Sequence, residues 1–69
     1  MIKNEEIIFK QHAIERMIDR GITKEQVKMA IERGSKFKQT EGILLKYTYF
    51  SVAYKKVGEL YIIKTIYVE

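Results

Sequence analysis

A single histidine and two arginines near the start of the chain are spaced to share one face of a helix. His12 precedes Arg16 by four residues and Arg20 by eight, which places the three side chains in one row spanning roughly 80° of a helix. An imidazole beside two permanent cations suits a site that handles an anion such as phosphate. We therefore treat His12 as a candidate general acid or base and the arginines as candidate phosphate ligands. The alternatives are a histidine that only packs near the helix start and arginines in surface ion pairs, for example with Asp19.

The last predicted strand carries a second set of candidate residues. Thr65 and Tyr67 alternate to one face, and strict alternation places Tyr61 and Ile63 on that face too. Tyr67 is a candidate proton donor or stacking ring, with Thr65 as an auxiliary group. The alternative for Tyr67 is a cross-strand aromatic pair that closes the core. Lys64 alternates with apolar residues of the opposite face, so it reaches past them to solvent, sits beyond the helices, or points into a site, where it would bind phosphate.

The distribution of charge favours a polyanionic partner. The 69 residues carry a net charge of +4, of which residues 1–34 contribute +1 and residues 35–69 contribute +3. Aromatic and cationic residues are interleaved in the second half, a pattern useful for RNA binding, although lysines also guard the edges of ordinary sheets. These residues are Tyr47, Tyr49 and Tyr54 with Lys46, Lys55, Lys56 and Lys64.

Composition excludes several kinds of site. The chain has no cysteine, so it has neither a disulfide nor a thiol nucleophile, and one histidine is too few for a closed zinc site. It has no glycine-rich phosphate loop, and its acidic residues are scattered, so we expect no bound metal and no cofactor. No apolar run approaches the ~20 residues that a membrane span needs, and no signal peptide is visible. We therefore expect a cytoplasmic protein without membrane contact.

Two helices are predicted to position the histidine row. The first runs from about residue 9 to 20 and ends at Gly21, which suits a left-handed cap. Residues 5–9 either begin this helix or are extended, because Ile8 and Phe9 fall outside its apolar stripe. That stripe comprises Ala13, Ile14, Met17 and Ile18.

The second helix is predicted over residues 24–33. Thr23 and Gln26 form a capping box at its start, and Gly34 is expected to end it as a glycine cap. The connection between the two helices is very short, so they form either a tight hairpin or a corner.

Strands follow the second helix. Runs rich in Ile, Val, Tyr and Thr predict strands over about residues 43–49, 51–57 and 60–68, with Gly58-Glu59 as a two-residue hairpin turn. Residues 36–39 can add a short edge strand. The sequence therefore predicts one α+β domain, in which an N-terminal helical hairpin packs on a three- or four-stranded antiparallel sheet.

The signature of the first helix resembles a prokaryotic family known only as a domain of unknown function. Members of that family carry His-Ala-x-x-Arg-Met-x-x-Arg-Gly-Ile and later a strand that ends in Thr-x-Tyr. The resemblance covers about residues 8 to 68, with Lys10 at a position where many relatives have a Ser or Thr helix cap. The matching residues are His12-Ala13, Arg16-Met17, Arg20-Gly21-Ile22 and Thr65-Ile66-Tyr67.

That family looks like a small relative of the RelE/ParE-type and BrnT-type toxins, which are grouped with barnase-like ribonucleases. The resemblance implies a RelE-like fold, metal-independent RNA cleavage and an antitoxin protein as partner. His12 would then be the acid or base, with Arg16 and Arg20 on the phosphate and Tyr67 and Thr65 as auxiliary groups. The alternatives are a catalytically inactive protein-interaction module, which includes a homodimer, and a sequence-tolerant nucleic-acid binder.

Overall fold

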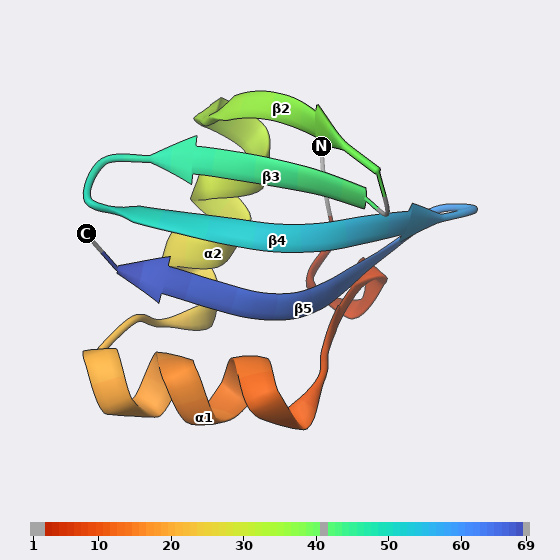
Figure 1. Cartoon of the computed structure of the whole chain (residues 1–69). Helices are drawn as coiled ribbons and strands as arrows, with labels where there is room; N and C mark the ends of the chain where they lie inside the picture. Colours follow the sequence, from red (N-terminus) through yellow and green to blue (C-terminus); the bar gives the residue numbers. More distant parts are fainter. Residues whose placement is uncertain (1–2, 41, 69) are drawn as a thin grey trace.

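The computed structural model describes residues 3–40 and 42–68, which form two helices and a five-stranded sheet (Figure 1). This confirms the predicted α+β class. The strands lie in the order β1-β5-β4-β3-β2. In chain order the elements are the 3-10 turn η1 (Asn4–Glu6), β1 (Ile7–Phe9), α1 (Gln11–Arg20), α2 (Lys24–Arg33), β2 (Ser35–Gln39), β3 (Gly42–Tyr47), β4 (Phe50–Val57) and β5 (Leu60–Val68).

The sheet has five strands, whereas the sequence predicts three or four, and it is mixed rather than antiparallel. β1 pairs in parallel with β5, with Ile7 opposite Tyr61, whereas the other pairs of neighbouring strands are antiparallel. The extended alternative for residues 5–9 is therefore correct for β1. The short edge strand near residues 36–39 is confirmed as β2. A three-residue strand contains too little alternation for the sequence to distinguish it from a helix start.

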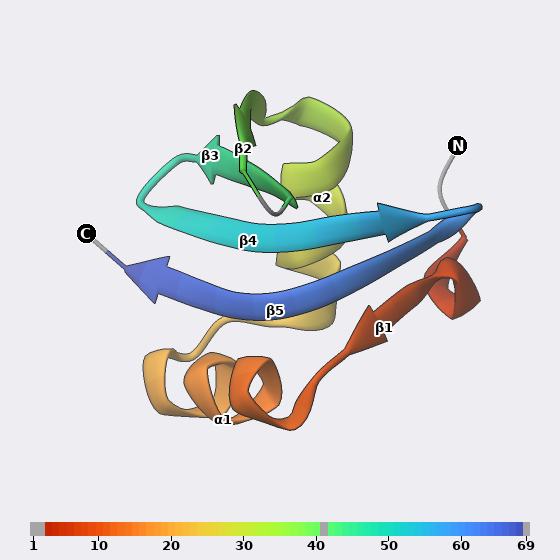
Figure 2. The ribbon, with the colours of Figure 1, turned by 45° about the vertical axis from the view of Figure 1, so that its right-hand side comes forward.

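The two helices form a corner and cover different parts of the sheet. α2 lies behind the sheet and contacts β3, whereas α1 runs along β5, crosswise to α2 (Figure 1 and Figure 2). The chain turns between them within three residues, so the corner is the correct one of the two predicted arrangements. α1 begins at Gln11 rather than residue 9, because Phe9 belongs to β1 and the Lys10 N–H donates to the Ile63 carbonyl at 3.1 Å. Neither helix in the described part of the chain is long and apolar enough to cross a membrane.

Local signals fix the junction between the helices as the sequence predicts. Gly21 is left-handed with φ 70°, and the next N–H, that of Ile22, donates to the Met17 carbonyl at 2.9 Å. The Thr23 hydroxyl accepts from the Gln26 N–H at 3.2 Å, and the Gln26 side chain accepts from the Thr23 N–H at 2.8 Å. The capping box is therefore confirmed.

Gly34 ends α2 as expected, but for a different reason. Its φ is −76°, which is not left-handed. A Cβ at this position would lie 2.6 Å from the Ala30 carbonyl oxygen and 2.7 Å from the Lys46 carbonyl oxygen. Glycine is therefore required because α2 passes directly against β3, and not because of a positive φ.

The core takes only half of the apolar stripe predicted for α1. Ala13 and Met17 are buried, whereas Ile14 is 39% exposed and Ile18 is 78% exposed. α1 lies against β5, so only the row that faces that strand is covered. The rest of the core comes mainly from α2 and the sheet: Ile7, Ile22, Val27, Ala30, Ile31, Leu45, Phe50, Val52, Tyr54, Ile63 and Ile66.

A β-bulge in β5 overturns the predicted alternation of that strand. Ala53 of β4 lies opposite Thr65, but the next residue, Tyr54, lies opposite Ile63, so Lys64 is the extra residue. The core-facing residues of β5 are therefore odd-numbered before the bulge, as at Ile63, and even-numbered after it, as at Ile66. Ile63 is fully buried while Tyr67 is 52% exposed, so the prediction that they share a face is wrong.

Candidate functional site

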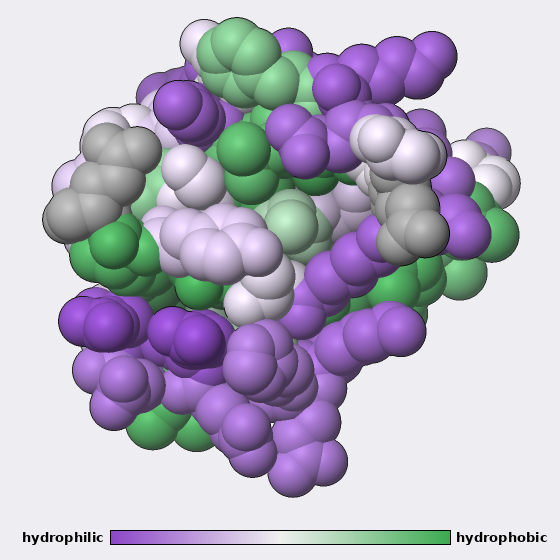
Figure 3. All heavy atoms as spheres, viewed as in Figure 1, coloured by the Kyte–Doolittle hydropathy of each residue, from purple (hydrophilic) through white to green (hydrophobic). Residues whose placement is uncertain are grey.

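The face of the sheet opposite α2 is hollowed. Figure 3 views this face directly and shows neutral and apolar surface at its centre with hydrophilic side chains around its margin. A hollow of about 790 Å³ lies here, lined by residues of β3, β4 and β5 and of the end of β2. We call it the sheet hollow; Lys46, Ser51, Ala53, Lys64 and Tyr67 are among its lining residues.

Small residues on the central strand make this face concave. Residues directly opposite each other on neighbouring strands point to the same side of a sheet. One such row contains Leu44, Ala53 and Thr65, and the next contains Lys46, Ser51 and Tyr67. In both rows the residue on β4 is smaller than its neighbours on β3 and β5. The side chains along the middle of this face are therefore shorter than those on either side, which leaves a hollow.

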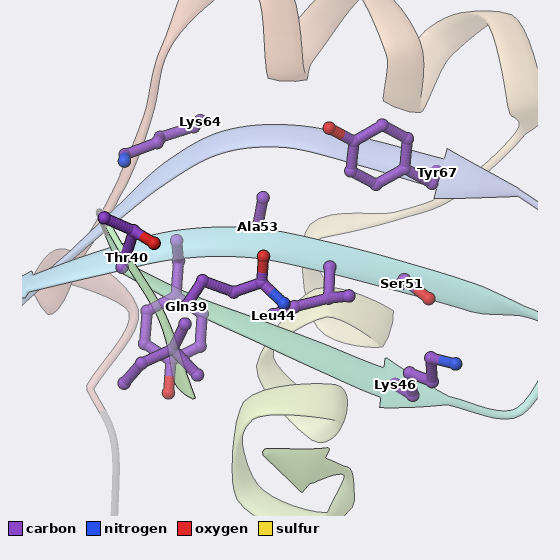
Figure 4. Close-up of a pocket in the computed structure, with 11 residues that line it drawn as sticks. Gln39, Thr40, Leu44, Lys46, Ser51, Ala53, Lys64 and Tyr67 are labelled. Atoms are coloured by element: carbon purple, nitrogen blue, oxygen red, sulfur yellow. The ribbon is translucent and has the colours of Figure 1, made fainter. Parts of the chain in front are cut away.

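Two lysines approach the sheet hollow from opposite sides. The Lys46 Nζ lies 5.6 Å from the centre of the Phe37 ring, a cation–π distance. The Lys64 Nζ lies 3.5 Å from the position that a Cβ on Gly42 would occupy, at the start of β3, and in Figure 4 its side chain points towards Thr40. Among the described residues that line the hollow, none carries a carboxylate. Two ammonium groups therefore belong to the described lining of the hollow.

The bulge explains why Lys64 reaches this surface. Strict alternation would group Lys64 with the inward-facing Ile66, where an ammonium group would be costly to bury. Because Lys64 is the extra residue, it lines the sheet hollow instead, and Ile63 and Ile66 on either side both enter the core. Of the positions that the sequence leaves open for Lys64, the structure shows the one in a candidate site.

Tyr67 lies outside the core, next to the sheet hollow. Its ring is 52% exposed, and in Figure 4 Tyr67 and Lys64 flank Ala53. The aromatic pair that does pack inside the sheet is Tyr54 with Tyr61, whose ring centres are 5.8 Å apart. Burial, together with the neighbouring Tyr61, raises the pKa of Tyr54 above its ordinary value of 10.0. The second exposed ring on the hollowed face is Phe37 of β2, which is 47% exposed.

The histidine row lies on α1, in a separate hollow of about 300 Å³. His12 and Arg16 line it together with two carboxylates, Glu15 and Asp19. All four side chains are exposed. Arg20 is not among the residues that line this hollow, and its Nε lies 3.8 Å from the Asp19 carboxylate.

The structure thus divides the predicted site residues between two surfaces. Lys64 and Tyr67 line the sheet hollow, and His12 and Arg16 line the α1 hollow. Thr65 lies in the row beside Ala53 but is not among the residues that line either hollow. Both surfaces flank β5, because α1 runs along that strand.

Phe37 and the small residues under the sheet hollow are not identified by the sequence analysis. Ser51 and Ala53 look like neutral strand positions until the register places them between larger neighbours. Phe37 is a lone aromatic residue in a short strand of polar residues, and an exposed aromatic residue among lysines is the signal that points to it.

A family model described as "Domain of unknown function (DUF4258)" matches residues 9–68 of the chain. This range includes both helices, four of the five strands and every residue that lines either hollow. No curated protein and no solved structure matches the chain.

Proposed function

The chain belongs to this family of unknown function, and we propose that its hollowed sheet face binds single-stranded RNA. The observation that carries the proposal is the sheet hollow itself. Two lysines and the exposed ring of Tyr67 are among its lining residues, and the exposed ring of Phe37 stands on the same face of the sheet. The net charge of +4, most of it from residues 35–69, has the same sign as these two lysines.

Each component of the hollow has a counterpart in a single-stranded nucleic acid. Unpaired bases expose flat faces that stack on aromatic rings, with about 1–3 kcal/mol per base lost on alanine substitution. Tyr67 and Phe37 supply such rings. Lys46 and Lys64 supply positive charge for phosphates, and binding releases the counterions that the phosphates had held. A paired helix hides its base faces, so stacking selects the single strand.

Anisotropy titration of a labelled mixed-sequence single-stranded RNA tests this proposal. We expect Tyr67→Ala to raise the Kd about fivefold or more, because a stacked base loses its ring. We expect the double change Lys46→Ala and Lys64→Ala to weaken binding and to flatten the slope of log K against log salt by about 1.4, since two phosphate contacts are lost. Thermal melts of each variant establish that it is folded.

The matched control is Lys36→Ala with Lys38→Ala. These two lysines lie opposite Leu45 and Ile43, on the side of β2 that faces away from the sheet hollow, and their removal changes the net charge equally. The proposal is wrong if the wild type binds no RNA at low salt. It is equally wrong if the control pair weakens binding as much as the Lys46 and Lys64 pair, because binding then follows net charge alone.

RNA cleavage is the second candidate function, favoured by the exposed imidazole of His12 beside Arg16 in the α1 hollow. Metal-independent cleavage needs a base for the ribose 2′-hydroxyl and an acid for the leaving oxygen. We expect wild type to cleave single-stranded RNA in EDTA and His12→Ala to lose that activity while staying folded. Such a result would support the toxin-like relationship and, with it, an antitoxin partner.

The other results of these two assays, together with light scattering, distinguish the remaining candidate functions. RNA binding without product from either protein supports a binder that does not cleave. Intact cleavage by pure His12→Ala removes this histidine from any mechanism. Absence of RNA binding together with a dimer in light scattering supports the protein-interaction module, with the hollowed face as an interface between two copies.

A further inference from the structure

The outer edge of β2 is a regular strand edge with no neighbouring strand in the described part of the chain. β2 (Ser35–Gln39) stands at the end of the strand order and pairs only with β3. All five of its residues are exposed. In an antiparallel pair, half of the backbone N–H and C=O groups of an edge strand point outward, where they are available to another strand.

β2 lacks most of the features that make an edge unsuitable for pairing. Its register with β3 runs without a shift from Ser35 opposite Lys46 to Gln39 opposite Gly42, so it contains no bulge. It contains no proline, and α2 lies behind the neighbouring strand β3. By contrast, β1 at the other edge has only three residues. Among the described residues, the protection left on β2 is its pair of lysines.

Those lysines determine what kind of strand can pair there. Lys36 and Lys38 lie two positions apart and therefore on the same face, opposite Leu45 and Ile43. Directly opposite like charges destabilise a pair of strands, and opposite charges stabilise it. A second copy of β2, aligned antiparallel about Phe37, would set Lys36 of each copy against Lys38 of the other. Self-pairing is therefore disfavoured, and a strand with acidic residues at alternate positions is favoured.

We propose that β2 binds an extended acidic segment of a partner protein as a sixth strand of the sheet. Backbone hydrogen bonds along the edge would hold the segment, and alternate Asp or Glu side chains would lie against Lys36 and Lys38. On the other face the segment would place an apolar side chain beside the exposed ring of Phe37. This site is on the edge of β2, whereas RNA binding is assigned to the sheet hollow, so the two proposals fail separately.

The test uses a labelled peptide of about ten residues in which glutamate and valine alternate, matched by a version with lysine in place of glutamate. We expect the acidic peptide to bind the wild type and the basic peptide not to bind. The double variant Lys36→Glu with Lys38→Glu should bind the acidic peptide about tenfold more weakly or worse, because two attractive cross-strand pairs become repulsive. The same variant should gain affinity for the basic peptide.

Two controls separate strand addition from general electrostatic attraction. Lys55→Glu with Lys56→Glu changes the net charge equally on β4, away from the β2 edge, and should bind as the wild type does. Two versions of the acidic peptide carry N-methyl groups on alternate backbone nitrogens, one on the odd and one on the even residues. The version whose methylated nitrogens face β2 cannot donate hydrogen bonds to that strand and should lose binding, whereas the other should still bind. Hydrogen exchange should slow at outward-facing amides of β2 when the acidic peptide is bound.

Three outcomes would overturn the proposal. The first is equal loss of binding in the β2 and β4 charge-reversal variants. The second is full binding of both methylated peptides. The third is exchange protection confined to the residues of the sheet hollow, which would show that an acidic ligand occupies the surface assigned to RNA.

Discussion

Tyr54 packs in the core and also makes the stability of the fold depend on pH. It is 2% exposed and contacts Tyr61, and burial followed by the effect of Tyr61 raises its pKa above 10.0. At neutral pH its hydroxyl is protonated in the folded and unfolded chains alike, so its ionisation costs nothing. Above about pH 10 the unfolded chain releases this proton more readily than the folded chain does.

We therefore expect Tyr54 to lower the stability of the fold in strong alkali. The stability associated with its protonated state is fully present below the unfolded pKa and is lost as pH rises through the folded pKa. Urea unfolding of wild type and Tyr54→Phe between about pH 8 and 11 measures this effect. Above about pH 10 the free energy of unfolding should fall more for the wild type than for Tyr54→Phe. Tyr67→Phe serves as the control with an exposed ring, and a pH-independent difference for Tyr54→Phe would contradict the expectation.

At the scale of elements, α1 has a weak start and a strong end. Lys10 occupies the cap position with an extended backbone, and its side chain makes no cap hydrogen bond. A lysine there also places positive charge at the positive end of the helix dipole. The end of α1, by contrast, has the glycine cap at Gly21. The first turn of α1, which carries His12, is therefore the part of the helix least supported by capping.

Lys10→Ser should stabilise the protein by about 0.5–2 kcal/mol, because the new hydroxyl can accept from a free N–H of the first turn. Thermal unfolding measures the gain, and the Lys10 N–H bond to the Ile63 carbonyl is retained in the variant. Lys10→Ala is the matched control, since it removes the charge without adding an acceptor. Equal stability of the serine and alanine variants would show that only the charge matters.

The elements differ in how far the sequence predicts them. α2 and the junction before it follow from local chemistry, because Thr23, Gln26 and Gly21 act on backbone groups within a few residues. The β3–β4 turn has no glycine, and Thr48 instead adopts a positive φ of 48°, which no local pattern indicates. The parallel pairing of β1 depends on a strand far along the chain, so it could not be predicted locally.

The site was predicted less completely than the fold, and the bulge is the main reason. A period-two pattern assigns every residue of β5 to a face, but one extra residue reverses the assignment on one side of it. Tyr67 and Lys64 therefore both line a surface that the sequence alone could not define. The spacing on α1 was sufficient to place His12 and Arg16 together, because both residues belong to one regular helix.

At the scale of the whole molecule, the fold depends on a small core. A 69-residue domain is stabilised by about 3–10 kcal/mol in total. Ile63 is fully buried in the middle of the sheet, whereas Ile18 is 78% exposed on α1. The same chemical change at these two isoleucines should therefore have very different effects.

Ile63→Ala should cost about 2–5 kcal/mol, because it removes buried methyl groups and leaves a cavity. That loss is a large share of the total, so we expect a sharply lowered melting temperature or an unfolded protein. Ile18→Ala should change the free energy of unfolding by less than about 0.5 kcal/mol. Urea titrations of both variants measure the comparison, and similar losses would mean that Ile18 is covered in solution.

The pairing of β1 with β5 also determines when the sheet can be completed during synthesis. Among the five strands of the sheet, β1 is synthesised first and β5 last. The antiparallel neighbours β2 and β3, β3 and β4, and β4 and β5 are consecutive in the chain, so each pair can form once its second strand has emerged. β1 therefore has no partner within this sheet until β5 has been synthesised. Closing so long a loop is slow relative to local contacts. The β1–β5 pair, and with it the alignment of α1 along β5, therefore forms only after β5 has been translated.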